Sequence, residues 1–260
     1  MVAYTAVPGR ATFLLVRLPW ERLADGVHRC RLEFCDVTVG LVRGAAGALL
    51  IDTGSTLVEA AAIDADARRI AGGPVTHVML THKHFDHVLG SPVFADADVY
   101  CAPEVADCLA SGTDRLRDDA LSHGADAAEI DRAIAALRPP RHRIHDTVID
   151  LGDRRVTVTH PGRGHTTGDL VVVVAAADGG PAVVFTGDLV EESADPCVDS
   201  DSDLGAWPAT LERVLALGGP DAVYVPGHGT VVDAEFVRRQ RDWLLAAGGH
   251  DRVGIGDADP

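Results

Sequence analysis

Residues 81–88, THKHFDHV, place three histidines and one aspartate within six consecutive positions, directly after the apolar run VTHVML at 75–80. Such a run is most simply a buried strand, so it predicts a strand that leads the chain straight into the histidine-rich stretch. Side chains that follow a buried strand emerge at the edge of a sheet. The stretch therefore predicts a polar site at a sheet edge, and a surface turn that binds nothing is the alternative.

The spacing of the histidines and the aspartate within this stretch suits two separate metal-binding positions. In an extended loop, His82 and His84 are two positions apart and point the same way. Asp86 and His87 then lie in or near the first turn of the next helix and face a second point. This arrangement favours two adjacent metal ions over one tetrahedral ion. Its imidazole and carboxylate groups suit an open hydrolytic site better than a closed, thiolate-rich structural site.

Three further fragments each combine glycines with one potential metal ligand beside an apolar run. They are GRGHTTGDL at 162–170, FTGDLV at 185–190 and VPGHGTV at 225–231, which contain His165, Asp188 and His228. Glycine lets the backbone turn sharply and approach another segment closely. One such fragment alone is more often a simple turn. Four fragments in this order, separated by β-rich segments, jointly predict a metal site.

The apolar and turn residues predict two runs of strands, each followed by helices. Strands are expected over 11–17, 26–32, 36–44, 47–54, 75–80, 97–102, 147–151, 155–160, 169–177, 181–188 and 221–227. Helices are expected over 56–70, where T-x-x-E forms a capping box, from 103 onward, and over 207–217 and 233–247. This order predicts one α/β domain over residues 1–260, with two similar layers facing each other and a frayed tail at 251–260.

Residues 113–138 differ from the rest of the chain. They show helical spacing of Leu, Ile and Ala together with many charges, and Gly124 is expected to divide them into two helices. The prolines at 139–140 end the segment. We predict an insertion or lid over the active face, and a plain outer helix pair is an equal alternative.

The net charge of the chain bears on the kinds of partner that it can bind. The chain has 23 Lys and Arg against 39 Asp and Glu, a net charge of −16, which repels phosphate backbones and makes nucleic acid an unfavourable partner. Only one basic residue is a lysine, Lys83, and it lies inside HKHFDH. We expect a solvated loop side chain there, and contact with an anionic substrate is the alternative.

Cysteines and the N-terminal residues bear on location. The five cysteines form no C-x-x-C pair and are odd in number, which predicts reduced, mostly structural thiols in a cytoplasmic protein. The apolar run near the N-terminus is short and is interrupted by Arg17, so neither export nor membrane association is expected.

Together these motifs resemble those of the metallo-β-lactamase superfamily, the αβ/βα sandwich metallohydrolases, from residue 37 to residue 245. LLIDTGS at 49–55 is similar to the early strand-and-turn motif of that family, HKHFDH to its principal metal motif, and GHTTGD, TGD and PGHG to its later motifs. The resemblance implies a four-layer αβ/βα sandwich in which two mixed sheets lie face to face with helices outside.

The resemblance also implies ligands and cofactors. One metal would be held by His82, His84 and His165, the other by Asp86, His87 and His228, and Asp188 would bridge both. The implied cofactors are two zinc ions, with iron or manganese as alternatives. Asp52 would accept a hydrogen bond from a motif residue and fix its orientation. Asp86 and Asp188 are the catalytic candidates, and a water shared by the two cations would become the hydroxide nucleophile.

Two details separate branches of the superfamily. Secreted class B β-lactamases often carry a cysteine where this chain has Asp188. The aspartate at this position resembles the glyoxalase II and lactonase branches more closely. Glyoxalase II enzymes add a helical domain after the PGHG motif, whereas only one helix is expected here. We therefore expect a dinuclear hydrolase that acts on a small ester, thioester, lactone or lactam.

Two other functions remain open on the sequence. A mononuclear iron oxygenase acting on a thiol persulfide uses a similar scaffold with fewer ligands. A metal-binding module without catalysis would keep the fold and lose the chemistry. The full complement of five histidines and two aspartates argues against both. A homo-oligomer is left open.

Overall fold

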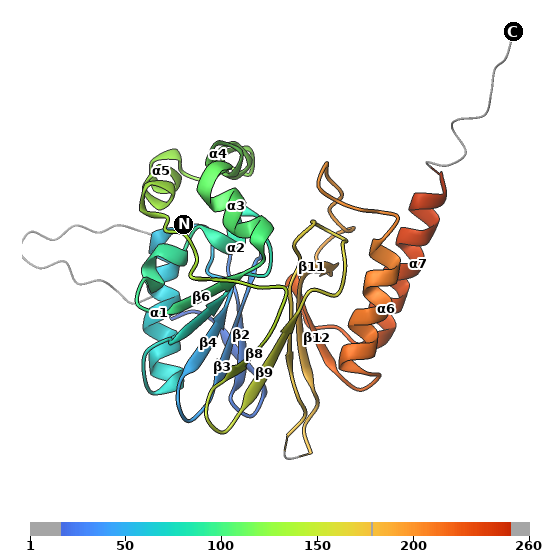
Figure 1. Cartoon of the computed structure of the whole chain (residues 1–260), viewed down its shortest axis with the longest axis horizontal. Coiled ribbons are helices and arrows are strands. Elements are labelled where there is room, and N and C mark those ends of the chain that lie inside the picture. Colours follow the sequence, from blue (N-terminus) through green and yellow to red (C-terminus); the bar gives the residue numbers. More distant parts are fainter. Residues whose placement is uncertain (1–16, 178, 251–260) are drawn as a thin grey trace, which may run out of the picture.

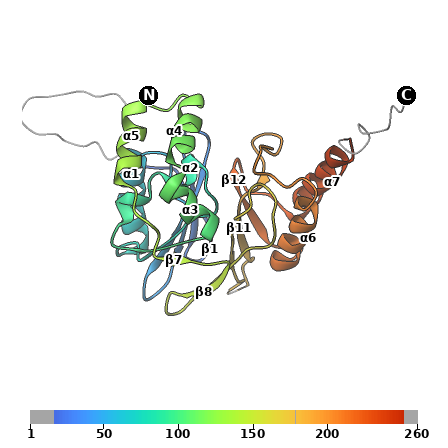
Figure 2. The same ribbon diagram turned by 45° about the horizontal axis from the view of Figure 1, so that its top comes forward.

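A computed structural model of the chain describes residues 17–177 and 179–250. Two sheets lie face to face, and helices cover their outer sides, so the layers run helix, sheet, sheet, helix (Figures 1 and 2). This is the αβ/βα sandwich that the sequence predicted. The strand expected over 11–17 lies outside the described residues except for its last position, and the tail at 251–260 lies wholly outside them.

The first sheet has seven strands in chain order. They are β1 (Trp20–Ala24), β2 (Val27–Arg31), β3 (Thr38–Arg43), β4 (Ala48–Ile51), β5 (His77–Met79), β6 (Asp98–Cys101) and β7 (His142–Arg143). Strands β1 to β4 pair antiparallel, and β4 to β7 pair parallel. The sequence did not predict β1 or β7. Both are edge strands, where one side of the ladder is unpaired and long apolar runs are absent.

The second sheet has five strands, in the order β12-β11-β10-β9-β8. They are β8 (Asp146–Asp150), β9 (Arg155–Thr159), β10 (Val171–Val174), β11 (Val183–Glu191) and β12 (Val223–His228). All nine residues of β11 are buried, as expected for a strand covered on both faces. Gly40 on β3 lies against the ring of Phe185, and Val37 bridges to His228, so the two sheets meet closely near the end of β12.

Helices cover the outer sides of both sheets (Figure 1). On the first sheet they are α1 (Leu57–Ala71), α2 (Phe85–Val88), the 3₁₀ helix η1 (Ser91–Phe94), α3 (Pro103–Ser111), α4 (Thr113–Ser122) and α5 (Ala127–Ala136), and on the second α6 (Trp207–Gly218) and α7 (Ala234–His250). The expected capping box opens α1: Thr56 Oγ1 accepts from the backbone N–H of Glu59. Among the described residues, every helix is too short or too polar to cross a membrane.

The segment at 113–138 forms two helices separated at Gly124, as predicted. Helix α4 packs against α2, and α5 packs against α1. Leu116, Ile130 and Ala133 are buried among core residues. The segment is therefore packed onto the helices beside it, and its role as an insertion or lid stays a prediction.

Candidate metal centre

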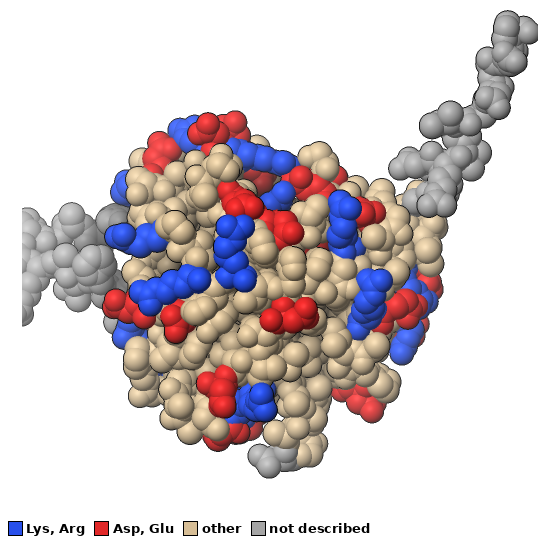
Figure 3. Space-filling view, in the orientation of Figure 1, with Lys and Arg blue, Asp and Glu red and all other residues tan. Residues whose placement is uncertain are grey.

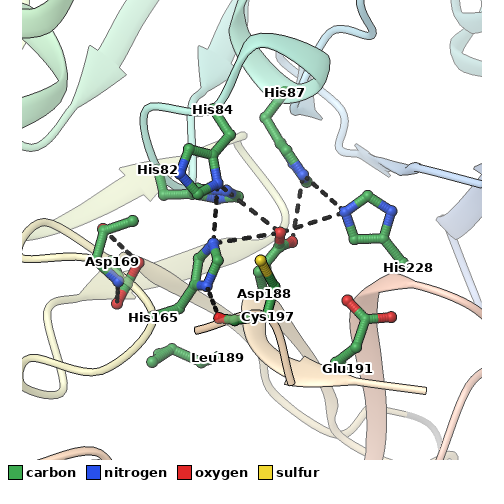
Figure 4. Close-up of polar contacts among 12 residues, drawn as sticks. His82, His84, His87, His165, Asp169, Asp188, Leu189, Glu191, Cys197 and His228 are labelled. Carbon is green, nitrogen blue, oxygen red and sulfur yellow. Dashed lines mark hydrogen bonds and ion pairs between the residues drawn. The ribbon is translucent and has the colours of Figure 1, made fainter. Parts of the chain in front are cut away.

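The structure brings all seven predicted ligand residues together, and Figure 4 labels six of them, all but Asp86. They come from the loop after β5, from α2, from the loop between β9 and β10, and from strands β11 and β12: His82, His84, Asp86, His87, His165, Asp188 and His228. Within each of two groups, one potential ligand atom per residue lies within 4.8 Å of the others. Strand ends and one short helix thus supply the whole cluster.

The first group contains His82, His84, His165 and Asp188. His84 Nδ1 lies 3.2 Å from His82 Nε2 and 2.9 Å from His165 Nε2. Asp188 Oδ2 lies 3.4 Å from His82 Nε2 and 3.5 Å from His165 Nε2. Three imidazole nitrogens and one carboxylate oxygen therefore face a common point.

The second group contains Asp86, His87 and His228. Asp86 Oδ2 lies 3.7 Å from His87 Nε2 and 3.5 Å from His228 Nε2. Asp188 also reaches this group, because its Oδ1 lies 3.2 Å from His87 Nε2 and its Oδ2 lies 3.2 Å from His228 Nε2. Asp188 thus stands between the two groups, as the resemblance implied.

The outer ring nitrogens are held by acceptors around the cluster. His228 Nδ1 donates to the carbonyl of Cys35 at 2.7 Å, and His165 Nδ1 donates to the carbonyl of Cys197 at 3.1 Å. His87 Nδ1 lies 2.8 Å from Asp52 Oδ2. Because a carbonyl or carboxylate oxygen can only accept, these Nδ1 atoms carry protons, and each ring in its neutral form, as a metal ligand requires, presents an Nε2 lone pair inward.

Asp52 organises the strand ends beneath the cluster. Its carboxylate accepts from the backbone N–H of Thr81 and from Thr81 Oγ1, both at 2.8 Å, as well as from His87. Since the Thr81 hydroxyl proton is used in this way, Thr81 Oγ1 accepts from His82 Nδ1 at 3.1 Å. Asp52 has a left-handed backbone with φ 61°, a strained conformation held by these bonds. The expected hydrogen bond from a motif residue is present.

The loops that carry His165 and His228 depend on local contacts. Asp169 accepts from the backbone N–H of Thr166 at 2.8 Å and from its hydroxyl at 2.6 Å, which closes the GHTTGD turn. Burial raises the pKa of Asp169 to about 7. A Cβ at Gly227 would lie 1.8 Å from Asp188 Oδ1, so only glycine allows β12 to pass this close to β11.

The donor set fits divalent metal ions. Inward lone pairs that face one another repel unless a positive charge lies between them. Asp188 Oδ1 is buried without a hydrogen-bond partner, which leaves it available as a ligand. Ligands around a tetrahedral zinc ion at about 2.0–2.1 Å are roughly 3.4 Å apart. The inner contacts of 2.9–3.5 Å in the first group match that spacing.

Electrostatics set His82 and His165 apart from the other three histidines. Burial opposes protonation of His84, but the carboxylates of Asp199, Asp188 and Asp86 outweigh it and raise its pKa. Burial lowers the pKa of His82 well below its usual value and that of His165 to about 4. Burial also opposes protonation of His87 and His228, but the carboxylate of Asp188 outweighs it and raises the pKa of His228 to about 10. Burial would likewise raise the pKa of Asp188, but the surrounding imidazoles hold it well below its usual range. The second group therefore attracts positive charge strongly.

Sequence reasoning missed two carboxylates near the cluster. Glu191 shares a group with Asp188 and His228, with potential ligand atoms within 4.8 Å of one another, and it is buried. Asp199 Oδ2 lies 3.7 Å from His84 Nε2. Glu191 follows the TGD motif by three positions, which is a weak signal, and nothing in the sequence marks Asp199.

The expectation for Lys83 was wrong. Its ammonium group lies 2.6 Å from Asp201 Oδ2, and only 17% of the side chain is exposed. Lys83 is therefore a partly buried member of an ion pair with a residue 118 positions away, rather than a solvated loop side chain.

The fold and the cluster together define an αβ/βα sandwich protein with a candidate metal centre at one edge of its sheets. The sequence model of the metallo-beta-lactamase superfamily matches residues 32–228, and the chain belongs to that superfamily.

Known proteins similar to the chain agree with this assignment. "Metallo-beta-lactamase domain-containing protein 1" of Homo sapiens is 31% identical over 194 residues, which cover 73% of this chain and 60% of that protein. "Metallo-beta-lactamase type 2" of Bacillus cereus is 24% identical over 172 residues, covering 65% of this chain and 58% of that protein. The chain thus spans less than two thirds of the length of these relatives.

Solved structures share the fold. The metallo-beta-lactamase FIM-1 from Pseudomonas aeruginosa, in its mono-zinc form, superimposes with a TM-score of 0.68 at 19% identity, over 89% of this chain and 96% of that one. At this identity the likeness concerns the fold alone.

Proposed function

We propose that the protein is a metal-dependent hydrolase with two divalent ions that acts on a small ester, thioester, lactone or lactam. The observation that carries the proposal is the convergence of five imidazole nitrogens and the carboxylates of Asp86 and Asp188 on two adjacent points. Family membership supports it, because the fold and motifs belong to a superfamily of metallohydrolases. The names of the curated relatives keep lactams within the proposed range.

The two groups of possible ligands support the following assignment. One ion would be held by His82, His84 and His165, the other by Asp86, His87 and His228, with Asp188 in contact with both. When bound, such ions supply Lewis acidity that polarises a carbonyl and lowers the pKa of a water molecule. Zinc fits these donors, and iron or manganese fits them as well.

The chain itself supplies orientation. Asp52, Thr81 and the carbonyls of Cys35 and Cys197 hold the imidazoles in one tautomer, so the rings present lone pairs without rearrangement. Asp86, 3.5 Å from His228 Nε2, is a ligand and a candidate acceptor for a proton during turnover. Fixed donors lower the reorganisation needed during the reaction.

Access to the centre is restricted. The side chains of His82 and His165 are 1% exposed and that of His87 is fully buried, whereas those of His84 and His228 are 17% and 13% exposed. A substrate therefore approaches beside His84 or His228.

Metal removal and restoration test the proposal. Dialysis against a strong chelator should abolish hydrolysis of a panel of thioester, ester, lactone and β-lactam substrates, and zinc or manganese should restore it. Elemental analysis of the same samples gives the number and identity of the ions. A phosphodiester serves as the negative control, because a net charge of −16 disfavours such substrates.

Two results would contradict the proposal. Unchanged hydrolysis by the metal-free protein would show that the activity does not depend on metal bound at the cluster. One iron ion per chain together with oxygen consumption in the presence of a thiol persulfide would instead indicate an oxygenase.

A further inference from the structure

Four charged side chains form a connected network beside His84. Asp199 Oδ2 lies 3.7 Å from His84 Nε2 and 3.6 Å from Arg115 Nη2. Arg115 Nη2 lies 2.7 Å from Asp201 Oδ2, and Lys83 Nζ lies 2.6 Å from the same oxygen. Two basic groups are therefore separated from the metal cluster by only one or two carboxylates.

The network lies beside His84, which with His228 is one of the two partly exposed histidines of the cluster. The Arg115 side chain is 57% exposed, and Asp199 and Asp201 are 31% and 21% exposed. Arg115 comes from α4, Lys83 from the HKHFDH loop, and the two aspartates from the segment between β11 and α6. A substrate that enters beside His84 meets these groups.

The carboxylates neutralise the cations. The side-chain cations of this network are Lys83 and Arg115, and Asp201 already pairs with both. Its carboxylate also repels a second negative charge at the same place. On the face shown in Figure 3, acidic and basic side chains likewise adjoin in several places.

On the side of His228, Arg29 is already bonded to the carboxylate of Glu21 and to the carbonyl of Gly229. Arg31, near His228 through the Cys35–Asp36 turn, forms two bonds to the carboxylate of Asp36, at 2.8 and 2.5 Å. Glu191 lies in a group with His228. Carboxylates therefore border the centre on both sides.

We propose that Asp201 is a specificity-determining residue, which selects for substrates without a negative charge near the scissile bond by neutralising Lys83 and Arg115. This inference rests on the proposed hydrolase function and narrows its substrates to neutral esters, thioesters, lactones and lactams.

The test compares two esters that differ in charge. The ratio of kcat/KM for 4-nitrophenyl hemisuccinate, which is anionic, to that for 4-nitrophenyl butyrate, which is neutral, is measured with metal-loaded protein. Asp201→Asn should raise this ratio about five- to tenfold, because Lys83 and Arg115 lose their shared counter-charge. The amide keeps the shape of the side chain and the backbone bond from Asp201 N to Asp199 Oδ1.

Matched variants control for charge and folding. Asp131→Asn removes the same charge from the Arg117–Asp131 pair between α4 and α5, and it should leave the ratio unchanged. Lys83→Gln should lower the ratio about fivefold, and in the Asp201→Asn background it should cancel most of the gain. Lys83→Gln alone still tests the proposal if Asp201→Asn fails to fold.

Two outcomes would overturn the proposal: a ratio that stays the same or falls in Asp201→Asn, or a rise of equal size in Asp131→Asn. Binding of benzoate to metal-loaded protein, measured by calorimetry, separates this inference from the proposed function. Asp201→Asn should bind benzoate about five- to tenfold more tightly than the unaltered protein even if neither ester is hydrolysed. Equal benzoate affinity would count against the role of Asp201.

Discussion

The two ligand groups of the centre differ in what they offer a metal ion. The first presents three imidazoles, from His82, His84 and His165. The second presents two imidazoles together with Asp86, and Glu191 lies beside it. Imidazole suits zinc, whereas added carboxylates improve the match to manganese or iron. If each group holds an ion, as proposed, the two positions joined by Asp188 should differ in metal preference.

The groups also differ in how their imidazoles are held. His87 in the second group is oriented by Asp52, which is buried and carries three hydrogen bonds. His84 in the first group faces Asp199, which is 31% exposed and 3.7 Å away. Buried charge-assisted bonds are stronger than exposed ones, so the second group is the more firmly fixed at this point.

The largest effect is expected at the residue that both groups share. Asp188→Ala removes a ligand from each position, so metal content should fall from two ions toward one and kcat/KM should fall by about a thousandfold or more. Elemental analysis and ester hydrolysis measure the two effects. His145→Ala, which replaces an exposed histidine paired with Glu104, is the control. Unaltered stoichiometry in Asp188→Ala would argue against its bridging role.

A smaller effect should separate the two groups. His165→Ala removes an imidazole from the first group and His228→Ala removes one from the second, and both side chains are held by backbone carbonyls. We expect His165→Ala to weaken zinc binding at the first group by about a hundredfold or more, and His228→Ala to weaken mainly binding at the second group. Competition with a fluorescent zinc chelator measures both. Identical zinc titration curves for the two variants would show that the two groups do not bind zinc differently.

The fold was predictable because its inner strands are apolar runs bounded by turns. The strands missed were β1, whose WERLA sequence exposes two of five residues, and β7, which has only two residues. The seven cluster residues were predictable because each lies in a short motif beside such a strand. Local sequence therefore specified both the strands and the side chains that their ends present.

What the sequence did not reveal depends on contacts between distant segments. Residues three apart on a regular strand face opposite sides, so a regular strand would not bring Asp188 and Glu191 together. The pairing of β11 with β12 shifts between Gly187 and Glu191, and this irregularity brings both side chains near His228. The carbonyl of Cys35 reaches His228 from 193 positions away. A backbone carbonyl leaves no residue-type signal in the sequence.

The orienting carboxylates give a weaker test of the same comparison. Asp52→Asn removes the buried acceptor charge behind His87 and should weaken the ion of the second group about ten- to a hundredfold. Asp199→Asn should weaken the ion of the first group by about threefold or less, because that carboxylate is partly exposed. Metal affinities from chelator competition check both variants. Equal losses would show that the two groups are held equally firmly.

The smallest effect concerns metal preference at the second group. Glu191→Gln keeps the size of the side chain and removes a carboxylate charge near Asp188 and His228. Because carboxylate oxygen favours manganese over softer ions, the affinity for manganese should fall about three- to tenfold while that for zinc changes about twofold or less. Manganese titration followed by electron paramagnetic resonance, with the first group filled by zinc, measures the change.

The neighbouring glutamate provides the control for this last variant. Glu192 accepts a bond from the backbone N–H of Thr230 at 2.7 Å and belongs to neither ligand group, so Glu192→Gln changes the charge equally without touching the cluster. A loss of manganese preference confined to Glu191→Gln means that this carboxylate acts at the ion itself. An equal loss in both variants means that net charge alone sets the preference. The difference in metal preference between the two groups would then depend only on their number of imidazoles and on Asp86.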